Sequence, residues 1–449
     1  MTQKASEFFI SFFTTVTSTV QPKQRQRLDQ TQRWTFSQLF GLTRRNPFMI
    51  SRWVLRWVLV GIIGGLFAAL YWNILELLTH ALQKLPGWGV LVVMPLAGLI
   101  VGLLIHFLGK PGEIGVIIDN IHFRSGRLDT GKNPAMILTS LVGISAGGSL
   151  GPEAPLVQVT GSFGTWVSDR LKLQGEDVRN MSLAGMAAGF TALFGAPLGG
   201  AVFALEILHH QYVVEYYQAL MPAIVSSCAS YLVFALITRL GIAPIWYLPQ
   251  YSLESIDDVL FAILLGMIGA LAGWVFVGIF HGCDRLFARI RGPVYIRTTL
   301  AGLGLGILAF SLPLTRYFGH DQLAIIATTS FSGILLLGLA LGKMAAIGVT
   351  VTGGWPGGFI IPLFFIGACL GKAIAVFIPG INPSLSMICV MAAINAAVTR
   401  TPISTTLLLS KLTNFAPLTP ILFASLIGFF FAPKVPLITS QIKSNQDAS

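Results

Sequence analysis

Charge is what this sequence has least of. Of its 449 residues only 10% are Asp, Glu, Lys or Arg, whereas 54% are hydrophobic. Soluble domains carry about 25% charged residues. The composition therefore excludes an ordinary soluble globule and indicates a chain that crosses a membrane several times.

Cysteine and the common catalytic motifs are also scarce. The four cysteines lie in or beside apolar segments and form no CxxC pair, which is typical of small buried hydrophobic residues. A phosphate-binding loop of the P-loop type and an HExxH motif are missing. The sequence therefore supports neither ATP-driven pumping nor metalloprotease chemistry, and we expect no cofactor, no metal and no enzymatic activity.

Apolar stretches long enough to cross a bilayer, which takes about 20 residues, recur along the chain. Such stretches cover 54–78, 88–108, 181–205, 217–239, 258–280, 296–313, 323–350 and 384–432. Shorter ones, interrupted by Gly or Pro, cover 135–150, 155–168, 359–378 and 402–412. Broken helices at membrane depth are tolerated only where they are buried in protein or line a cavity. The pattern thus predicts an all-α polytopic membrane protein with a transport path.

The net charge of +11 is concentrated at the N-terminus. Nine of the 29 Lys and Arg residues lie within the first 56 residues, where only Glu7 and Asp29 oppose them. A basic flank before the first span predicts a cytoplasmic N-terminus that can lie on anionic lipid, and it argues against nucleic acid as the partner. We expect a basic tail over 1–50, membrane repeats over 51–240 and 241–433, and a short tail over 434–449.

Glu153 is the most informative residue. It lies in the sequence Gly-Pro-Glu-Ala-Pro, and no other charged residue occurs between Lys132 and Asp169. An acidic group at the bilayer centre costs roughly 2.5–3.5 kcal/mol on insertion scales, so a function usually retains it. The prolines predict a fresh helix start here, and a buried helix N-terminus attracts anions. A carboxylate beside it would compete with a mobile anion, although a helix-capping role carries about equal weight.

The two halves of the chain share a pattern. Gly151, Pro155, Leu156 and Gly164 are matched by Gly358, Pro362, Leu363 and Gly371, all at an offset of 207. A second block, Met-Ala-Ala followed by a proline, begins at 186 and again at 391. Internal repeats with breaks at corresponding places indicate a midplane substrate site. We therefore expect the site between the loops near 151–155 and 354–362.

Two further loops open apolar segments in the same way. The second-repeat loop contains four glycines over 353–358, and the amides of Phe359 and Ile360 would point at an ion from a helix start. A third Gly/Pro-rich loop covers Gly109 to Ile114. Three such loops favour an ion site over three ordinary turns.

These loops, in this order, resemble those of the CLC family of chloride channels and chloride/proton antiporters. The motif around Glu153 is similar to the family's GREGP motif and aligns this residue with the gating glutamate. GGFIIP at 357–362 resembles GxFxP, and PGEI at 111–114 resembles the remains of GSGIP. The stretch 194–200 with Glu206 resembles the family's Ala-Pro-Leu helix. The resemblance covers about 55–435.

The resemblance implies a CLC fold of tilted, broken helices in two inverted-topology repeats. It also implies a homodimer with one anion path per subunit and, given the short segment after the last apolar stretch, no cytosolic CBS pair. Anion-binding positions would be Gly109, Lys110, Gly151, Pro152, Gly358, Phe359, Ile360 and Ile438. A prokaryotic plasma membrane is the expected location.

Several positions depart from the family pattern. Gly109, followed by Lys110, stands where the family has a serine whose hydroxyl contacts the anion, and Ile438 stands in place of a tyrosine. Pro152 replaces the motif's arginine. Both side-chain anion ligands are therefore expected to be lost, which leaves backbone amides as ligands. This change could favour leak, or it could mark a different anion, since fluoride-selecting relatives also alter the serine position.

The expected proton path begins at Glu153 and ends at the cytosolic side. Relatives often carry two adjacent glutamates there, but this sequence has Glu206 and Ile207. Loss of the second carboxylate is similar to the channel branch, although some antiporters also lack it. Glu206, His209 and His210 fall on neighbouring helical positions. We expect mostly a solvated helix end, with a histidine proton relay or a metal site as lesser alternatives.

The leading prediction is chloride transport gated by Glu153, either as a channel or as a chloride/proton antiporter. Taking a carboxyl group out of water favours its protonated form, so gating should depend on outside pH. Fluoride export is the alternative substrate hypothesis. An intramembrane metal-dependent enzyme that uses Glu153 as acid/base is a remote alternative.

Overall fold

The computed structural model describes residues 47–84, 86–112, 115, 126–208, 213–249, 251, 256–414, 417–435 and 437. The chain divides into two units, residues 1–55 and 56–449. The second unit contains the site. Most of the basic tail predicted over 1–50 lies outside the described residues.

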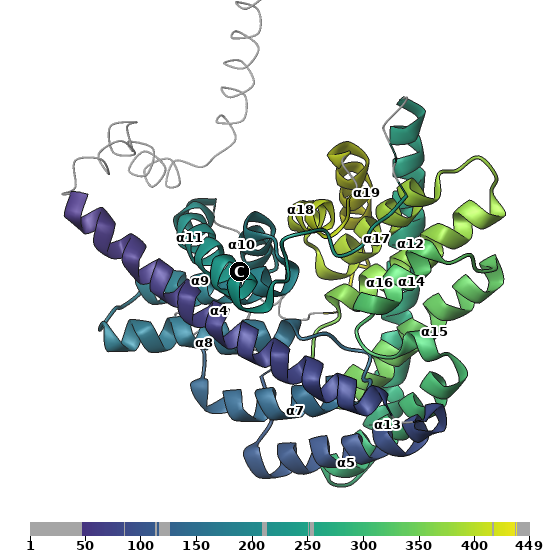
Figure 1. Ribbon diagram of the computed structural model, residues 1–449, viewed down its shortest axis with the longest axis horizontal. Helices are drawn as coiled ribbons and strands as arrows, with labels where there is room; N and C mark the ends of the chain where they lie inside the picture. Colours follow the sequence, from purple (N-terminus) through teal and green to yellow (C-terminus); the bar gives the residue numbers. More distant parts are fainter. Residues whose placement is uncertain are drawn as a thin grey trace, which may run out of the picture. The chain divides into compact units, whose positions relative to one another are not determined.

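The described part of the chain is helical, which confirms the all-α prediction (Figure 1). Its α-helices are α4 (Pro47–Gln83), α5 (Val90–Leu108), α7 (Asn133–Ser145), α8 (Glu153–Arg170), α9 (Glu176–Phe194), α10 (Pro197–Glu206), α11 (Val213–Thr238), α12 (Ile256–Ala288), α13 (Val294–Ser311), α14 (His320–Thr328), α15 (Gly333–Thr352), α16 (Ile360–Phe377), α17 (Pro383–Thr399), α18 (Pro402–Leu412) and α19 (Leu418–Phe430). Short 3₁₀ turns cover Gly87–Gly89, Thr130–Lys132 and Pro313–Thr315.

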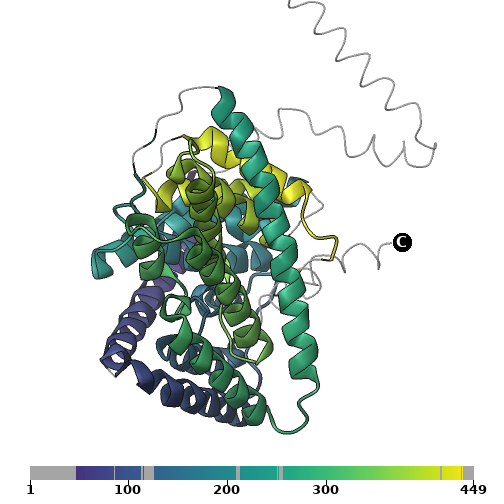
Figure 2. The ribbon, with the colours of Figure 1, turned by 90° about the vertical axis from the view of Figure 1, so that its right-hand side faces the viewer.

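Within the described residues, seven helices are long and apolar enough to cross a membrane. They are α4, α5, α11, α12, α13, α15 and α16. Many of their large apolar side chains are exposed on the protein surface, among them Leu236 (74%) and Ile334 (78%), as expected for helices that face lipid. The chain is a multi-pass integral membrane protein. In Figure 2 the long helix α12 runs along one side of this unit.

Several of the predicted long stretches are broken helices. The apolar stretch 384–432 contains α17, α18 and α19, and the stretch 181–205 contains most of α9 and α10. Gly195, with φ of +61°, ends α9 in the left-handed conformation, and α10 begins at Pro197. The shorter stretch predicted over 402–412 coincides with α18. Hydropathy alone did not locate the break at Gly195, because proline at a first helical turn interrupts the hydrogen-bond ladder without lowering hydrophobicity.

The second halves of the two predicted repeats have matching helices. α8, α9 and α10 correspond in order to α16, α17 and α18, and α8 packs on α9 as α16 packs on α17. The repeated glycines Gly164 and Gly371 lie at these contacts. A Cβ on Gly164 would be 2.1 Å from the Met181 carbonyl oxygen, and one on Gly371 would be 2.4 Å from that of Ser386. Only glycine allows these backbones to approach so closely.

Candidate functional site

The site is centred on a reciprocal backbone pair between the two repeats. Gly151 N donates to Gly358 O and Gly358 N donates to Gly151 O, each at 2.8 Å. These glycines form one of the two glycine pairs that the sequence repeat matched at an offset of 207. Residues two positions after each one open helices α8 and α16. The pair therefore brings the N-termini of two helices from opposite repeats to one place.

Glu153 occupies this place. Its side chain is 0% exposed, and Oε1 accepts a hydrogen bond from Ile361 N at 3.0 Å. Oε2 is buried without a hydrogen-bond partner among the described residues. A Cβ added to Gly151 would lie 2.2 Å from Oε2, and one added to Gly358 would lie 2.3 Å from it. The carboxylate therefore occupies a space that the two glycines leave open. We call this space, bounded by Gly151, Gly358 and the first turn of α16, the seat.

The seat has the electrostatics of an anion site. The first amides of a helix have no acceptor within the helix and carry a positive partial charge. The predicted ligands Phe359 and Ile360 are the N-cap and first residue of α16, and Asn395 Nδ2 donates to Ile360 O at 3.1 Å. Pro152 is the N-cap of α8. The backbone amides of Ile361 and Ile360 both act on the Glu153 carboxylate, and Ile361 N donates to Oε1 at 3.0 Å.

Trp355 connects the loops on either side of the seat. Its side chain is 2% exposed, and Nε1 donates to the Thr298 carbonyl oxygen at 2.9 Å. A Cβ on Gly143 or Gly148 would lie 3.1 Å from the indole ring. The indole thus packs on the segment leading to Gly151 and is anchored to α13. Sequence patterns did not single it out, because nothing local marks a contact between positions about 200 residues apart.

The loop after α5 shows which of its residues approaches the site. Gly109 ends α5 with φ of +88° and is exposed, as is Lys110. Gly112 is buried, and a Cβ on it would lie 2.4 Å from Gln158 Oε1. Within the described part of this loop, Gly112 is therefore the residue that reaches α8. The assigned anion-binding role of Gly109 and Lys110 stays a prediction.

Glu206, at the end of α10, accepts three hydrogen bonds from the first turn of α18. The donors are Ile403 N (3.0 Å), Ser404 N (2.8 Å) and Ser404 Oγ (2.6 Å). The side chain is thus a helix cap between the repeats. Ile207, next to it, is 1% exposed.

Three other predicted site residues, Ile438, His209 and His210, lie outside the described residues. Within the described residues, no group of three or more His, Cys, Asp or Glu side chains could hold a metal. The roles of Ile438 and the two histidines stay predictions.

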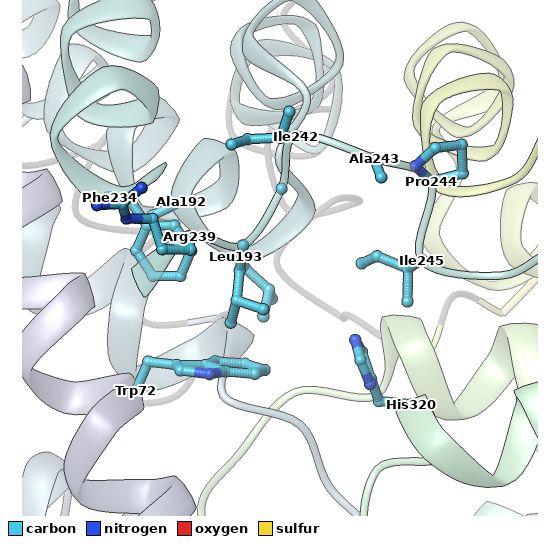
Figure 3. A pocket seen from close by; sticks show the side chains of 12 residues that line it. Trp72, Ala192, Leu193, Phe234, Arg239, Ile242, Ala243, Pro244, Ile245 and His320 are labelled. Carbon is cyan, nitrogen blue, oxygen red and sulfur yellow. The ribbon is translucent and has the colours of Figure 1, made fainter. Parts of the chain in front are cut away.

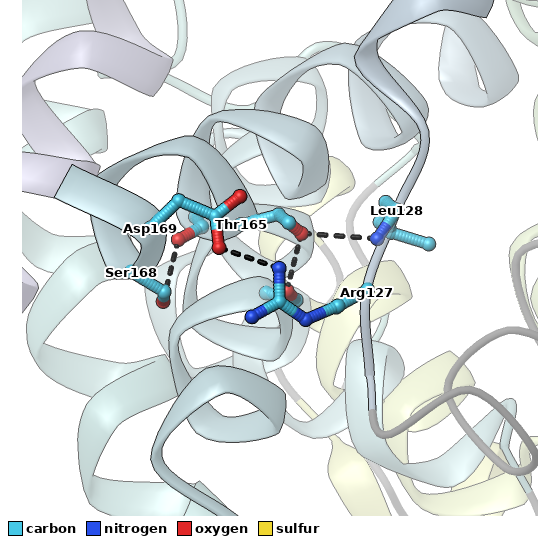
Figure 4. A network of polar contacts seen from close by, with 7 residues as sticks. Arg127, Leu128, Thr165, Ser168 and Asp169 are labelled. Atoms are coloured by element: carbon cyan, nitrogen blue, oxygen red, sulfur yellow. Dashed lines mark hydrogen bonds and ion pairs between the residues drawn. The ribbon is translucent and has the colours of Figure 1, made fainter. Parts of the chain in front are cut away.

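Polar contacts fix the far end of α8 (Figure 4). Leu128 N donates to Thr165 Oγ1 at 3.0 Å, and this hydroxyl also pairs with Ser182 Oγ at 2.9 Å. Arg127 forms an ion pair with Asp169. The segment of Arg127 and Leu128 and the helix α9 are both bonded to α8. These bonds fix the position of the helix that carries Glu153.

A separate cavity of about 260 Å³ lies under the connection between the repeats (Figure 3). Trp72, Phe234 and His320 line it together with residues 239–245. The Trp72 and His320 rings lie on the same side of the cavity, with centroids 6.1 Å apart. None of the predicted site residues lines it.

Comparison with known proteins identifies the family of this chain. The family model described as voltage gated chloride channel matches residues 97–433, and the chain belongs to this family. A chloride/fluoride channel protein of Pseudomonas syringae pv. tomato is 30% identical over 307 residues, which cover 66% of this chain and 67% of that protein.

Two solved structures have the same fold. A CLC-type fluoride/proton antiporter superposes with a TM-score of 0.78 at 21% identity and covers 89% of this chain and 99% of its own. A slow cyanobacterial Cl⁻/H⁺ antiporter has a TM-score of 0.75 at 20% identity and covers 88% and 99%. The predicted CLC fold is therefore confirmed.

Proposed function

We propose that the protein transports chloride across the membrane, with Glu153 as the gate. The observation that carries this proposal is the buried carboxylate of Glu153, the first residue of α8, which contacts the first turn of α16 and accepts a hydrogen bond from Ile361 N. In this position the carboxylate takes the place of a mobile anion. Protonation removes its charge and weakens its hold on the helix N-terminus, so an anion can take its place.

The test is anion efflux from liposomes that contain the purified protein. Wild-type flux should rise as the outside pH falls, whereas Glu153→Gln and Glu153→Ala should give a permanently open path without pH dependence. Ser168→Ala is a matched control, because its hydroxyl donates to Gly164 O within α8 and lies four turns from the gate. Retained pH dependence in both Glu153 variants would refute the gate assignment.

Proton coupling is a separate question, and the proposed inner end of the path is Glu206 with Ile207, His209 and His210. The proton flux driven by an imposed chloride gradient decides it. Uphill proton movement that stops in Glu153→Ala would identify an antiporter without the usual inner carboxylate. Loss of that movement in His209→Ala or His210→Ala would support the relay. Chloride flux without proton flux would identify a channel.

Fluoride is the second candidate substrate, supported by the Pseudomonas syringae relative named as a chloride/fluoride channel protein. Parallel efflux assays with the two anions compare them directly. If the efflux rate of fluoride greatly exceeds that of chloride, fluoride is the main substrate instead of chloride.

We further propose a homodimer in a prokaryotic plasma membrane, with the N-terminus in the cytoplasm. The basic cluster before α4 supports this orientation. Single-molecule photobleaching of labelled protein in liposomes tests the dimer, because a monomer would bleach in one step. Labelling of a cysteine introduced near the N-terminus, from either side of the membrane, tests the orientation.

A further inference from the structure

Gln158 is a buried amide without a partner. Its side chain is 3% exposed, and neither Oε1 nor Nε2 has a hydrogen-bond partner in the part of the chain that the structure describes. Another buried amide, Asn395, has a partner for each of its polar atoms: Nδ2 donates to Ile360 O and Oδ1 accepts from Thr399 Oγ1. Buried polar groups are nearly always paired, so an unpaired primary amide indicates a missing ligand.

Its position relates it to the gate. Gln158 is on α8, five residues after Glu153, which corresponds to about 7.5 Å along the helix axis. No other charged side chain occurs in the sequence between Glu153 and Asp169, so nothing on this helix neutralises an anion there. The Gln158 amide therefore lies on the helix that begins at the gate, further from its N-terminus than Glu153.

The Gln158 side chain faces the backbone of the loop after α5. Gly112 is buried, and its missing side chain leaves room for the Gln158 amide: a Cβ would be 2.4 Å from Oε1 and 3.3 Å from Nε2. Gly112 belongs to the loop where the family resemblance expected a serine hydroxyl. The amide thus packs against Gly112 with Oε1 as the nearer atom, and Nε2, an unused N–H donor, lies farther from this glycine. This donor can supply the hydrogen bond that a lost serine hydroxyl would have supplied.

We propose that Gln158 Nε2 donates a hydrogen bond to the transported anion at a second position, beside α8. This proposal rests on the proposed anion transport and assigns one of its specificity-determining residues. A neutral N–H donor suits a partly dehydrated halide, because it replaces a water hydrogen bond without the attraction of a full charge. Small, strongly hydrated fluoride depends more on such a donor than chloride does.

Two near-isosteric variants separate ligand binding from packing. Gln158→Met keeps the length and volume but removes both polar atoms, and Gln158→Glu keeps the shape but adds a negative charge. Chloride and fluoride efflux are measured in liposomes, and chloride binding to detergent-purified protein by calorimetry, with Ser168→Ala as the control. Because the readout is the fluoride-to-chloride rate ratio of each protein, differences in the amount of folded protein cancel.

We expect Gln158→Met to weaken chloride binding about tenfold, the equivalent of one hydrogen bond to a charged group, and to lower the fluoride-to-chloride ratio. Gln158→Glu should slow both anions further. An unchanged ratio and unchanged binding in Gln158→Met, beside an active wild type, would overturn the role of Gln158 and leave the transport proposal intact. A wild type that moves neither anion would overturn both.

Discussion

The glycine at 358 is expected to be a requirement of the gate, and Gly358→Ala tests this. An added Cβ would lie 2.3 Å from Glu153 Oε2, 2.7 Å from Cδ and 2.6 Å from Cβ. Ordinary contact needs about 3.4 Å or more, so the carboxylate must move by about 1 Å. Because the Glu153 Cβ is also too close, rotation of the carboxylate alone does not relieve the clash.

That displacement removes the hydrogen bond between Ile361 N and Glu153 Oε1, which is 3.0 Å long. A hydrogen bond to a charged group contributes about 1.5–3 kcal/mol. Its loss should therefore shift the equilibrium of the Glu153 carboxylate by about 10- to 150-fold, from the position in which it fills the seat towards the position in which it leaves the seat empty. We expect faster anion efflux at pH 7.5 and weaker pH dependence than in the wild type.

The assay is anion efflux from liposomes at several outside pH values. Gly338→Ala is the matched control, because an added Cβ there has no atom within 4 Å. The double variant Glu153→Ala/Gly358→Ala should transport like Glu153→Ala alone, since the clashing carboxylate is gone. Wild-type rates and pH dependence in Gly358→Ala would refute the reasoning.

Three other predictions concern stability, measured as thermal unfolding in detergent. Trp355→Phe removes the hydrogen bond to the Thr298 carbonyl and should cost about 1 kcal/mol, whereas Trp355→Ala also leaves a cavity and should cost about 3–5 kcal/mol; equal costs would contradict the packing role. Lys343 is 0% exposed, and its Nζ donates to the Thr315 and Tyr317 carbonyls. Lys343→Met should lower the free energy of unfolding by about 1–3 kcal/mol for each carbonyl left unpaired. No loss would mean that the cost of burying the amine cancels the energy of its hydrogen bonds. Glu206→Ala should cost about 1–2 kcal/mol as a lost cap of α18, with no loss expected if the carboxylate has only a proton-carrying role.

Much of this site could be predicted because its information is local and occurs twice. A lone carboxylate beside proline identified Glu153, and the matched glycines identified Gly151 and Gly358. The helix start near 360 followed from the same repeat. The Ile361 amide, which also donates to Glu153, was not predicted beside that of Ile360, since a helix boundary read from sequence does not fix how many amides of the first turn face a ligand.

Contacts between distant segments were not predictable. The end of α5 at Leu108 agrees with the predicted stretch 88–108, but which glycine of the following loop faces α8 depends on the path of the chain after the helix. The cap that Glu206 provides to α18 joins residues about 200 positions apart, as does the packing of Trp355. One unaligned sequence carries no trace of such pairs.

The reciprocal pair of Gly151 and Gly358 also limits how the protein can move. Each glycine is both donor and acceptor for the other, so separating the repeats at this point would leave two amides and two carbonyls unsatisfied at membrane depth, where each costs several kcal/mol. A cycle that rocks one half against the other is therefore opposed at the very centre. Opening is expected to be a small event in which a single side chain rotates within a backbone frame that stays closed.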